Sequence, residues 1–327
     1  IQSAIDNLTD AYRNQSPYTG QDIEVEFALA QRDPNCNATT GILRVDGSGT
    51  SDYATNGLTT SGSDNEATIK ALSKWPNTTY YNIWVVAGID CNMGGGGVQG
   101  FAYFPGAPSS VDGAVILYNS FGYDPTGSLG YELKSYTNRN VTTIHELGHA
   151  FNLYHTFEGD GSGSTCPVGN DCGSGLGDCC GDTPPHKRSS SDCDASGTNS
   201  CDGGSSKSLY VHNFMDYSSD VCQTEFTAEQ KTRMRAALVA SRGGLLNSLA
   251  TTAPGGSLPT AGCVSTTTDL SGNFPLGVYG FTFNDLDVTS GSSYSDDGYA
   301  DRTCYFQTTV TAGTSYPITV NTGTSYN

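Results

Sequence analysis

Three of the five histidines in this chain lie within eleven residues of one another, and their spacing limits the local fold more than any other feature. Segment 143–155 reads TIHELGHAFNLYH, with H-E-x-x-H at His145, Glu146 and His149 and a further histidine at His155. A four-residue step along an α-helix advances about 6 Å and about 40° beyond one full turn. His145 and His149 are therefore expected to project from one face of one helix.

Two imidazoles placed in this way can hold one zinc ion at about 2.0–2.1 Å from each nitrogen. Glu146 leans toward the same side, where it can reach a zinc-bound water without ligating the metal. It can then take the proton of that water and give it to a leaving amine. A catalytic zinc needs three protein ligands and one open position, and His155 is the expected third ligand.

His155 can share the metal only if the helix ends before it. A continued helix would place residue 155 about 60° away from His149 and about 9 Å further along. Glycine usually adopts the left-handed turn that ends a helix. This chain has Asn152 there, and asparagine tolerates that conformation best after glycine, so we expect the break at Asn152. An alternative scheme with a glutamate ligand is set aside, because none of the later glutamates lies in a suitable helical motif: Glu158, Glu225 and Glu229.

Composition limits the classes of function. The 327 residues include 15 basic and 33 acidic side chains, which give a net charge of −18. A nucleic-acid-binding protein usually carries a basic surface, and an anionic membrane surface would repel this chain. No run of about 18 apolar residues is present to span a bilayer. The low charge density and the high Ser, Thr and Gly content fit a secreted, extracellular protein, which we expect to be bacterial.

The eleven cysteines favour disulfides over a cysteine-ligated metal. A C-x-x-C pair, which is typical of zinc ribbons, is absent, and disulfides belong to oxidising compartments. Since eleven is odd, one thiol is free or its partner lies outside this chain. Six cysteines lie in one stretch rich in Gly, Ser and Asp: Cys166, Cys172, Cys179, Cys180, Cys193 and Cys201.

Hydrophobic periodicity predicts a mixture of helices and strands. Helices are expected at 1–14, 66–75, from near Val141, and at 227–241, where Thr227 and Gln230 form a capping-box pattern. Strands are expected at 23–30, 80–88, 98–104 and 113–119. Residues 251–262 have the composition of a linker, and residues 263–327 predict a small all-β module.

These motifs resemble those of the metzincin zinc metalloproteases, and more narrowly those of the pappalysin family, which includes ulilysin. The resemblance covers about residues 1–245. Most metzincins have glycine where this chain has Asn152, which affects only the detail of the turn. The matching segments are HELGHAFNLYHTFEG at 145–159, DTP at 182–184, HNFMDYSSDVC at 212–222, EFTAEQKTRM at 225–234, FALAQRDP at 27–34 and GFAYFPG at 100–106.

The resemblance implies an α+β fold. A zincin-like (metzincin) catalytic domain over 1–250 would contain a twisted mixed sheet, an active-site helix and an irregular C-terminal subdomain, with a substrate cleft between upper (about 1–152) and lower (about 153–250) subdomains. Strand 113–119 would be the edge strand that pairs with extended substrate. After the linker, 263–327 would be a partial β-sandwich accessory module. The family's first strand and propeptide would precede the first helix, and the accessory module resembles only the first part of a β-sandwich, so we expect a chain truncated at both ends. A monomer is also expected.

Roles for single residues also follow from the resemblance. Met215 would form the Met-turn, a hydrophobic floor below the zinc. The hydroxyl of Tyr217 would stabilise the tetrahedral intermediate, and a packing role is its alternative. Family members also bind calcium beside the active site, for which Asp160 and Asp182 are the candidates, although acidic loops are more often simply solvated.

The resemblance implies two disulfides, Cys166–Cys201 and Cys193–Cys222. Elimination suggests Cys36–Cys91 and Cys263–Cys304 as further pairs. Cys172 is left to pair with Cys179 or Cys180, which leaves one cysteine over.

The predicted function is that of a secreted zinc-dependent metalloendopeptidase that hydrolyses peptide bonds in proteins. Two other classes compete: a non-catalytic binding or adhesion protein that kept a zinc fold, and a structural domain stabilised by calcium. Loss of Glu146 or of a histidine ligand would favour these classes, but all four residues are present.

Overall fold

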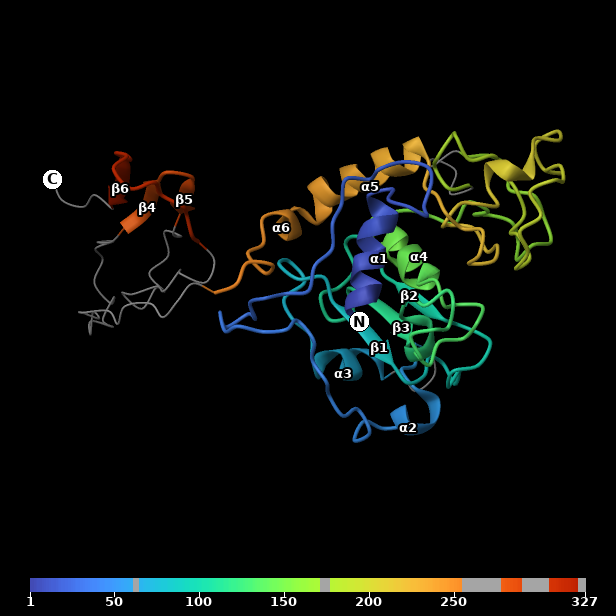
Figure 1. The fold of residues 1–327 in the computed structure, drawn as a ribbon, viewed down its shortest axis with the longest axis horizontal. Helices are drawn as coiled ribbons and strands as arrows, with labels where there is room; N and C mark the ends of the chain where they lie inside the picture. Colours follow the sequence, from blue (N-terminus) through green and yellow to red (C-terminus); the bar gives the residue numbers. More distant parts are fainter. Residues whose placement is uncertain (61–64, 171–176, 255–277, 290–305, 323–327) are drawn as a thin grey trace. The chain divides into compact units, whose positions relative to one another are not determined.

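The computed structural model describes residues 1–60, 65–170, 177–254, 278–289 and 306–322 (Figure 1). The chain divides into two compact units. The first contains residues 1–29 and 42–247, and the second contains residues 30–41 and 248–327. No described helix is long and apolar enough to cross a membrane.

The first unit contains a three-stranded mixed sheet with the strand order β1-β3-β2. Strand β1 (Ile83–Val86) runs parallel to β3 (Ala114–Leu117), and β2 (Gly100–Ala102) runs antiparallel to β3. Thus β3 is the central strand, and the prediction that 113–119 forms the edge strand is wrong. The reason is visible in the burial: all four residues of β3 are buried, as its unbroken apolar run requires of a central strand, whereas β2 is half-buried.

Helix α4 (Val141–Ala150) contacts β2, β3 and helix α1 (Gln2–Tyr12), which lies beside it in Figure 1. The Tyr12 hydroxyl donates to the Ile144 carbonyl at 3.1 Å. At the other end, the Asn140 side chain donates to the Ala4 carbonyl at 2.9 Å. Both helices contribute buried side chains to one core, so α4 is fixed along its length.

Helix α4 ends in the predicted left-handed turn, in which Asn152 has φ 76°. The Asn152 amide donates to the His149 carbonyl at 2.9 Å, and the Leu153 amide donates to the Gly148 carbonyl at 2.9 Å. These two bonds define a Schellman motif, which satisfies carbonyls that the last helical turn would otherwise leave unpaired. The predicted break at Asn152 is therefore confirmed.

Other helices follow the sequence pattern in part. Helix α5 (Ala228–Ser241) begins with the capping box between Thr227 and Gln230, as predicted. Helix α3 (Glu66–Ala71) is shorter than the predicted 66–75, because the backbone of Trp75 is held in a turn by two hydrogen bonds to the Asn82 side chain, both 2.9 Å. The short elements are α2 (Tyr53–Asn56), η1 (Tyr118–Ser120), η2 (Lys207–Leu209) and α6 (Gly243–Leu246).

The predicted strand at 23–30 is absent, although its alternation has a physical cause. Ile23 is buried and Phe27 packs against the same core, so alternate residues do face inward. The backbone, however, bonds to helix α1 rather than to a strand. The Phe27 amide donates to the Thr9 hydroxyl at 2.9 Å, and that hydroxyl donates to the Phe27 carbonyl at 3.1 Å. The segment is irregular, with Glu24 at φ 61°, and it is bonded to helix α1.

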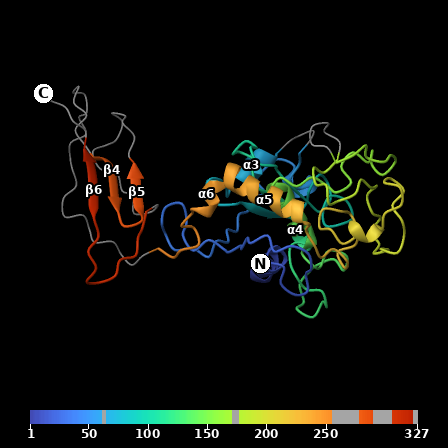
Figure 2. The same ribbon diagram turned by 90° about the horizontal axis from the view of Figure 1, so that it is seen from above.

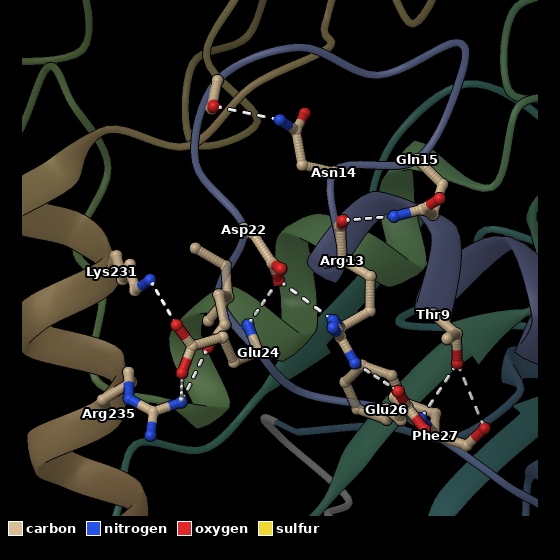
Figure 3. Close-up of polar contacts among 12 residues, drawn as sticks. Thr9, Arg13, Asn14, Gln15, Asp22, Glu24, Glu26, Phe27, Lys231 and Arg235 are labelled. Atoms are coloured by element: carbon tan, nitrogen blue, oxygen red, sulfur yellow. Dashed lines mark hydrogen bonds and ion pairs between the residues drawn. The ribbon is translucent and has the colours of Figure 1, made fainter.

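Polar contacts fix the outer side of this segment (Figure 3). Glu24 forms ion pairs with two basic side chains of helix α5, Lys231 at 2.9 Å and Arg235 at 3.1 Å. Asp22 pairs with Arg13 at the end of helix α1 at 3.0 Å. The segment therefore connects the first helix of the unit to helix α5.

The region between α4 and α5 is irregular, since regular structure among its described residues is limited to η2. Two disulfides cross-link it. Cys166–Cys201 and Cys193–Cys222, the pairs that the resemblance implies, have Cα–Cα distances of 5.3 and 5.7 Å. Such staples suit a region with few regular backbone bonds.

Two other assignments of cysteines fail. Cys91 is a free thiol while Cys36 is disulfide-bonded, so the pair Cys36–Cys91 is wrong. Elimination misled here because it contains no information on the distance between two Cα atoms. Cys180 is free and buried and Cys179 is disulfide-bonded, which excludes Cys180 as the partner of Cys172. The suggested Cys263–Cys304 pair lies outside the described residues.

The second unit contains three antiparallel strands in the order β5-β4-β6, which Figure 2 shows side by side. They are β4 (Val278–Phe283), β5 (Leu286–Thr289) and β6 (Ile318–Thr322). A two-residue turn with Asn284 at φ 55° joins β4 to β5, a conformation that favours asparagine. The described strands have the all-β character predicted for this end of the chain.

The turn at Asn152 generates a prediction about stability. Asn152→Val is expected to lower the free energy of unfolding by about 1–2 kcal/mol, because a β-branched residue is strained at positive φ. Asn152→Gly, the matched control, should remain within about 1 kcal/mol of the original. Urea denaturation of the purified proteins measures both values, and equal stabilities for the two variants would contradict this account of the turn.

Candidate active site

The three histidines of the motif converge on one point. Helix α4 presents His145 and His149 on one face, and the turn at Asn152 returns the chain so that His155 meets them. The Nε2 atom of His155 lies 3.2 Å from that of His145 and 3.2 Å from that of His149. Among the described residues this is the only group found whose nitrogen, sulfur or carboxylate atoms could hold a metal ion together.

Backbone carbonyls orient two of the three rings. The Nδ1 atom of His145 lies 2.7 Å from the Phe214 carbonyl, and that of His149 lies 2.7 Å from the Leu153 carbonyl. A carbonyl only accepts, so each Nδ1 is the donor and the lone pair of each ring is on Nε2. The tautomer is thereby fixed for ligation through the converging atoms.

The rings are also held in the neutral form that a ligand needs. Burial, with a smaller contribution from neighbouring His149, lowers the pKa of His145 to about 3, although the hydrogen bond to Phe214 opposes this shift. Burial likewise lowers the pKa of His149 and that of His155, and for His155 the repulsion from the other two rings adds to the effect.

This donor set fits zinc. Tetrahedral ligation at about 2.0–2.1 Å requires ligand nitrogens about 3.3–3.4 Å apart, close to the 3.2 Å that separates His155 Nε2 from the other two. Three neutral imidazoles with one open position are also the ligand set of several catalytic zinc sites. The residues present therefore match the ion that the sequence predicts.

Glu146 lies between His145 and His149 in the sequence, and its side chain is buried. It lies beside the edge strand β2. Burial raises the pKa of its carboxyl to about 8, against the opposing hydrogen bond to the backbone of Ala102 in strand β2. This contact places a proton-accepting group at the junction of helix α4 and β2. The carboxyl lies outside the three-histidine group, as a general base rather than a ligand should.

Met215 and Tyr217 contact the residues of the site in different ways. Met215 is fully buried, and its sulfur packs so closely on Gly148 of helix α4 that any Cβ there would collide with it. Tyr217 is 43% exposed, with its ring centroid 5.0 Å from that of His155 and 5.8 Å from that of His145. Met215 therefore packs against helix α4, and Tyr217 faces both the histidines and solvent.

The two acidic calcium candidates are both engaged by protein donors. Asp160 forms a bidentate ion pair with Arg188, at 2.8 Å from Nε and 2.7 Å from Nη2. A carboxylate already neutralised in this way does not fit a calcium site. Asp182 accepts hydrogen bonds from the Thr227 hydroxyl at 2.8 Å and the Glu229 amide at 2.9 Å, at the N-terminus of helix α5, where a negative charge is favourable.

Sequence reasoning missed several groups that shape the site. The Phe214 and Leu153 carbonyls and the Ala102 amide act through the backbone, so no residue type signals them. Phe157 stacks on His155, and Arg188 lies over Phe157. Phe157 follows His155 by two residues and could have been suspected, but Arg188 has no recognisable local signal.

Comparisons with known proteins agree with this geometry. A family model of peptidase family M43, described as "Pregnancy-associated plasma protein-A", matches residues 63–239, which is more than half of the chain. Mature mirolysin of Tannerella forsythia, solved in complex with a cleaved peptide, is 28% identical with a TM-score of 0.58, covering 75% of this chain and 87% of that chain. A promirolysin mutant of the same organism is 27% identical with a TM-score of 0.54, covering 75% and 76%.

Several curated relatives are fungal. An extracellular metalloprotease of Sordaria macrospora is 40% identical over 147 residues, 42% of this chain and 43% of that protein. Extracellular metalloprotease 1 of Coccidioides posadasii is 40% identical over 146 residues, 42% and 44% of the two proteins. The match therefore spans less than half the length of these relatives. On the family match and the zincin-like fold, the chain belongs to the pappalysin family of metzincin peptidases.

Proposed function

We propose that this chain is a zinc-dependent endopeptidase that hydrolyses peptide bonds in proteins. The observation that carries the proposal is the convergence of three neutral imidazole Nε2 atoms, two of them from the helix that also carries Glu146. Relatives named extracellular metalloproteases support this activity and an extracellular location. They are fungal, so they lend no support to the bacterial origin that composition suggested.

His145, His149 and His155 would hold the zinc ion through Nε2. Zinc bound there supplies Lewis acidity, which makes water more acidic and polarises a substrate carbonyl. Glu146 accepts a proton from the attacking water and later delivers it to the nitrogen of the leaving amine. The hydrogen bond to the backbone of Ala102 holds this carboxyl at the junction of helix α4 and strand β2, where it can serve both steps.

Tyr217 is proposed to donate a hydrogen bond from its hydroxyl to the oxygen that becomes negative in the transition state. Its exposure of 43% supports this role, because a tyrosine that served only the core would be buried. Met215 is proposed as the Met-turn residue that supports helix α4 from below.

The substrate is proposed to bind as an extended peptide along β2 rather than β3. Strand β2 is an edge of the described sheet, and its residue Ala102 contacts Glu146. An extended peptide can add a strand to such an edge through backbone hydrogen bonds, which brings its scissile bond close to the general base. The solved mirolysin complex with a cleaved peptide is in keeping with peptide binding in this family.

Further aspects of the proposal rest on composition and on the resemblance to the family. They comprise a catalytic domain over 1–250 with subdomains that meet near residue 152, a linker at 251–262, an accessory module from 263, a removable propeptide and a monomeric state. A calcium role is proposed only at Asp182, since Asp160 is paired with Arg188. No observation favours a non-catalytic binding protein.

Glu146 generates a prediction about activity. Glu146→Gln should lower kcat/KM on casein by at least about a hundredfold, because the variant keeps the shape of the side chain but loses the general base. Zinc content, measured by atomic absorption, should remain that of the original protein. Glu26→Gln, on a side chain 67% exposed, is the matched control and should keep full activity.

A chelator supplies the complementary measurement for the same site. Removal of the metal should abolish caseinolysis, and added zinc should restore it. A protein that binds zinc but cleaves no peptide, in wild-type and variant form alike, would instead favour the binding-protein reading.

Tyr217 generates a separate prediction. Tyr217→Phe should reduce kcat by about 10²–10³-fold with little change in KM, because the lost hydroxyl acts on charge that develops only in the transition state. Steady-state kinetics on a fluorogenic peptide measures both constants. If Tyr217 only packs against its neighbours, Tyr217→Phe should instead lower the melting temperature and leave kcat unchanged.

A further inference from the structure

The third histidine is held differently from the other two. The Nδ1 atoms of His145 and His149 each bond to a backbone carbonyl at 2.7 Å. Among the described residues, the acceptor facing Nδ1 of His155 is a Glu158 carboxylate oxygen at 3.9 Å, which is too long for a hydrogen bond. The side chain of His155 is also 24% exposed. Another interaction must therefore fix the orientation of His155.

Aromatic packing surrounds this ring. Phe157 stacks on His155 with ring centroids 4.7 Å apart and planes inclined by 8°. Tyr217 contacts both rings edge-on, at 5.0 Å from His155 and 4.7 Å from Phe157. Phe157 is only 3% exposed, so the stack is formed by a buried partner that cannot easily rotate away.

Arg188 supports this aromatic group. The guanidinium carbon lies 4.8 Å from the centroid of Phe157 and 5.6 Å from that of Tyr217, within the range of cation–π attraction. A guanidinium can stack on an aromatic ring while its edge donates hydrogen bonds elsewhere. Arg188 thus contacts the ring that holds His155 and the tyrosine proposed to act in catalysis.

Asp160 fixes Arg188 in that position. Its carboxylate, only 3% exposed, accepts from Nε at 2.8 Å, from Nη2 at 2.7 Å and from the Arg188 amide at 3.1 Å. Asp160 is itself bound to the turn that contains Phe157, because its amide donates to the Phe157 carbonyl at 3.0 Å. Asp160 is therefore bonded both to the backbone of Phe157 and to the guanidinium that packs on the ring of Phe157.

The same segment is linked to the turn that carries Tyr217. The Ser189 amide donates to the Asp216 carboxylate at 3.1 Å, and the Thr156 amide donates to the Met215 carbonyl at 3.2 Å. Arg188 is therefore located between the turn after His155 and the turn before Tyr217, in contact with both.

We propose that Arg188, held by Asp160, is a positioning residue that orients His155 for zinc and Tyr217 for the substrate oxygen. The inference rests on the proposed function, in which His155 is a zinc ligand. Partners of this kind, which touch ligands rather than the metal, commonly change metal affinity about 10–100-fold when they are removed.

The test compares Arg188→Gln with Arg188→Lys, Asp160→Asn and the Asp160→Asn/Arg188→Gln double variant. Zinc affinity is measured by competition with a chromophoric chelator, and ligand geometry by the visible absorption of the cobalt(II)-loaded protein. Arg13→Gln is the matched control, because Arg13 also pairs with carboxylates, those of Asp22 and Glu26 (Figure 3), and neither partner belongs to the site.

Arg188→Gln should weaken zinc binding about 10–100-fold and alter the cobalt spectrum. Arg188→Lys should recover part of the affinity, since it keeps the charge but loses the planar fork. Asp160→Asn should shift both readouts in the same direction, and the double variant should be no worse than Arg188→Gln, because the two residues act as one unit. Arg13→Gln should change neither readout.

A positioning role also predicts that kcat falls more than KM rises. Unchanged zinc affinity and cobalt spectrum in a folded Arg188→Gln protein would overturn the inference, even if its melting temperature fell, since that is what a purely structural ion pair would give. If Arg188→Gln fails to fold, the same readouts on Arg188→Lys and Asp160→Asn decide. Failure of the wild-type protein to bind zinc would refute the proposed function itself, which keeps the two failures distinct.

Discussion

The reversal of the chain at Asn152 is the constraint on which the site depends. Its positive φ ends helix α4 just after His149, and without it His155 would continue along the helix away from the other two rings. The same turn places the Leu153 carbonyl on Nδ1 of His149. One strained backbone position thus brings the third imidazole to the site and also fixes the tautomer of the second. The Arg233 side chain donates to the Asn152 carbonyl from helix α5, which ties the turn to the second half of the unit.

A second constraint is the position of strand β2. Because β3 is paired on both sides, the exposed edge next to helix α4 belongs to β2, and its Ala102 contacts Glu146. The Arg242 guanidinium holds the far side of this junction, with Nε donating to the Ala150 carbonyl at 2.8 Å and Nη2 to the Tyr103 carbonyl at 3.4 Å. The end of the active-site helix and the end of the edge strand are therefore fixed to one side chain.

Sequence alone predicted the features that depend on local spacing. The helix with two facing histidines, the asparagine turn and the capping box of helix α5 all follow from residues within about one helical turn of each other. It failed where partners are distant. Segment 23–30 alternates like a strand but pairs with helix α1, and the order of the strands is not encoded in any one of them. Arg188 was missed because Asp160, 28 residues away, gives it its orientation.

Two kinds of titratable side chain surround the site: neutral imidazoles and charged groups held in ion pairs. The three imidazoles are kept neutral by burial, so they can act as ligands. Two buried carboxylates nearby, Asp112 and Asp160, are each paired with an arginine. Arg242 pairs with Asp112 at 2.9 Å, although 130 residues separate them, and Arg188 pairs with Asp160.

Such buried pairs contribute little net stability relative to well-packed apolar residues, but removal of one partner is strongly destabilising, because the other charge is left unpaired. They are therefore suited to define geometry in a unit whose second half has few regular elements. In this chain the disulfides restrict where the irregular loop can go, and the ion pairs determine where its side chains point. Asp160 shows the difference, since its burial alone would raise its pKa, yet the hydrogen bonds from Arg188 outweigh that effect and lower it to about 2. Its carboxylate therefore remains charged and keeps Arg188 against the aromatic rings throughout the neutral range of pH.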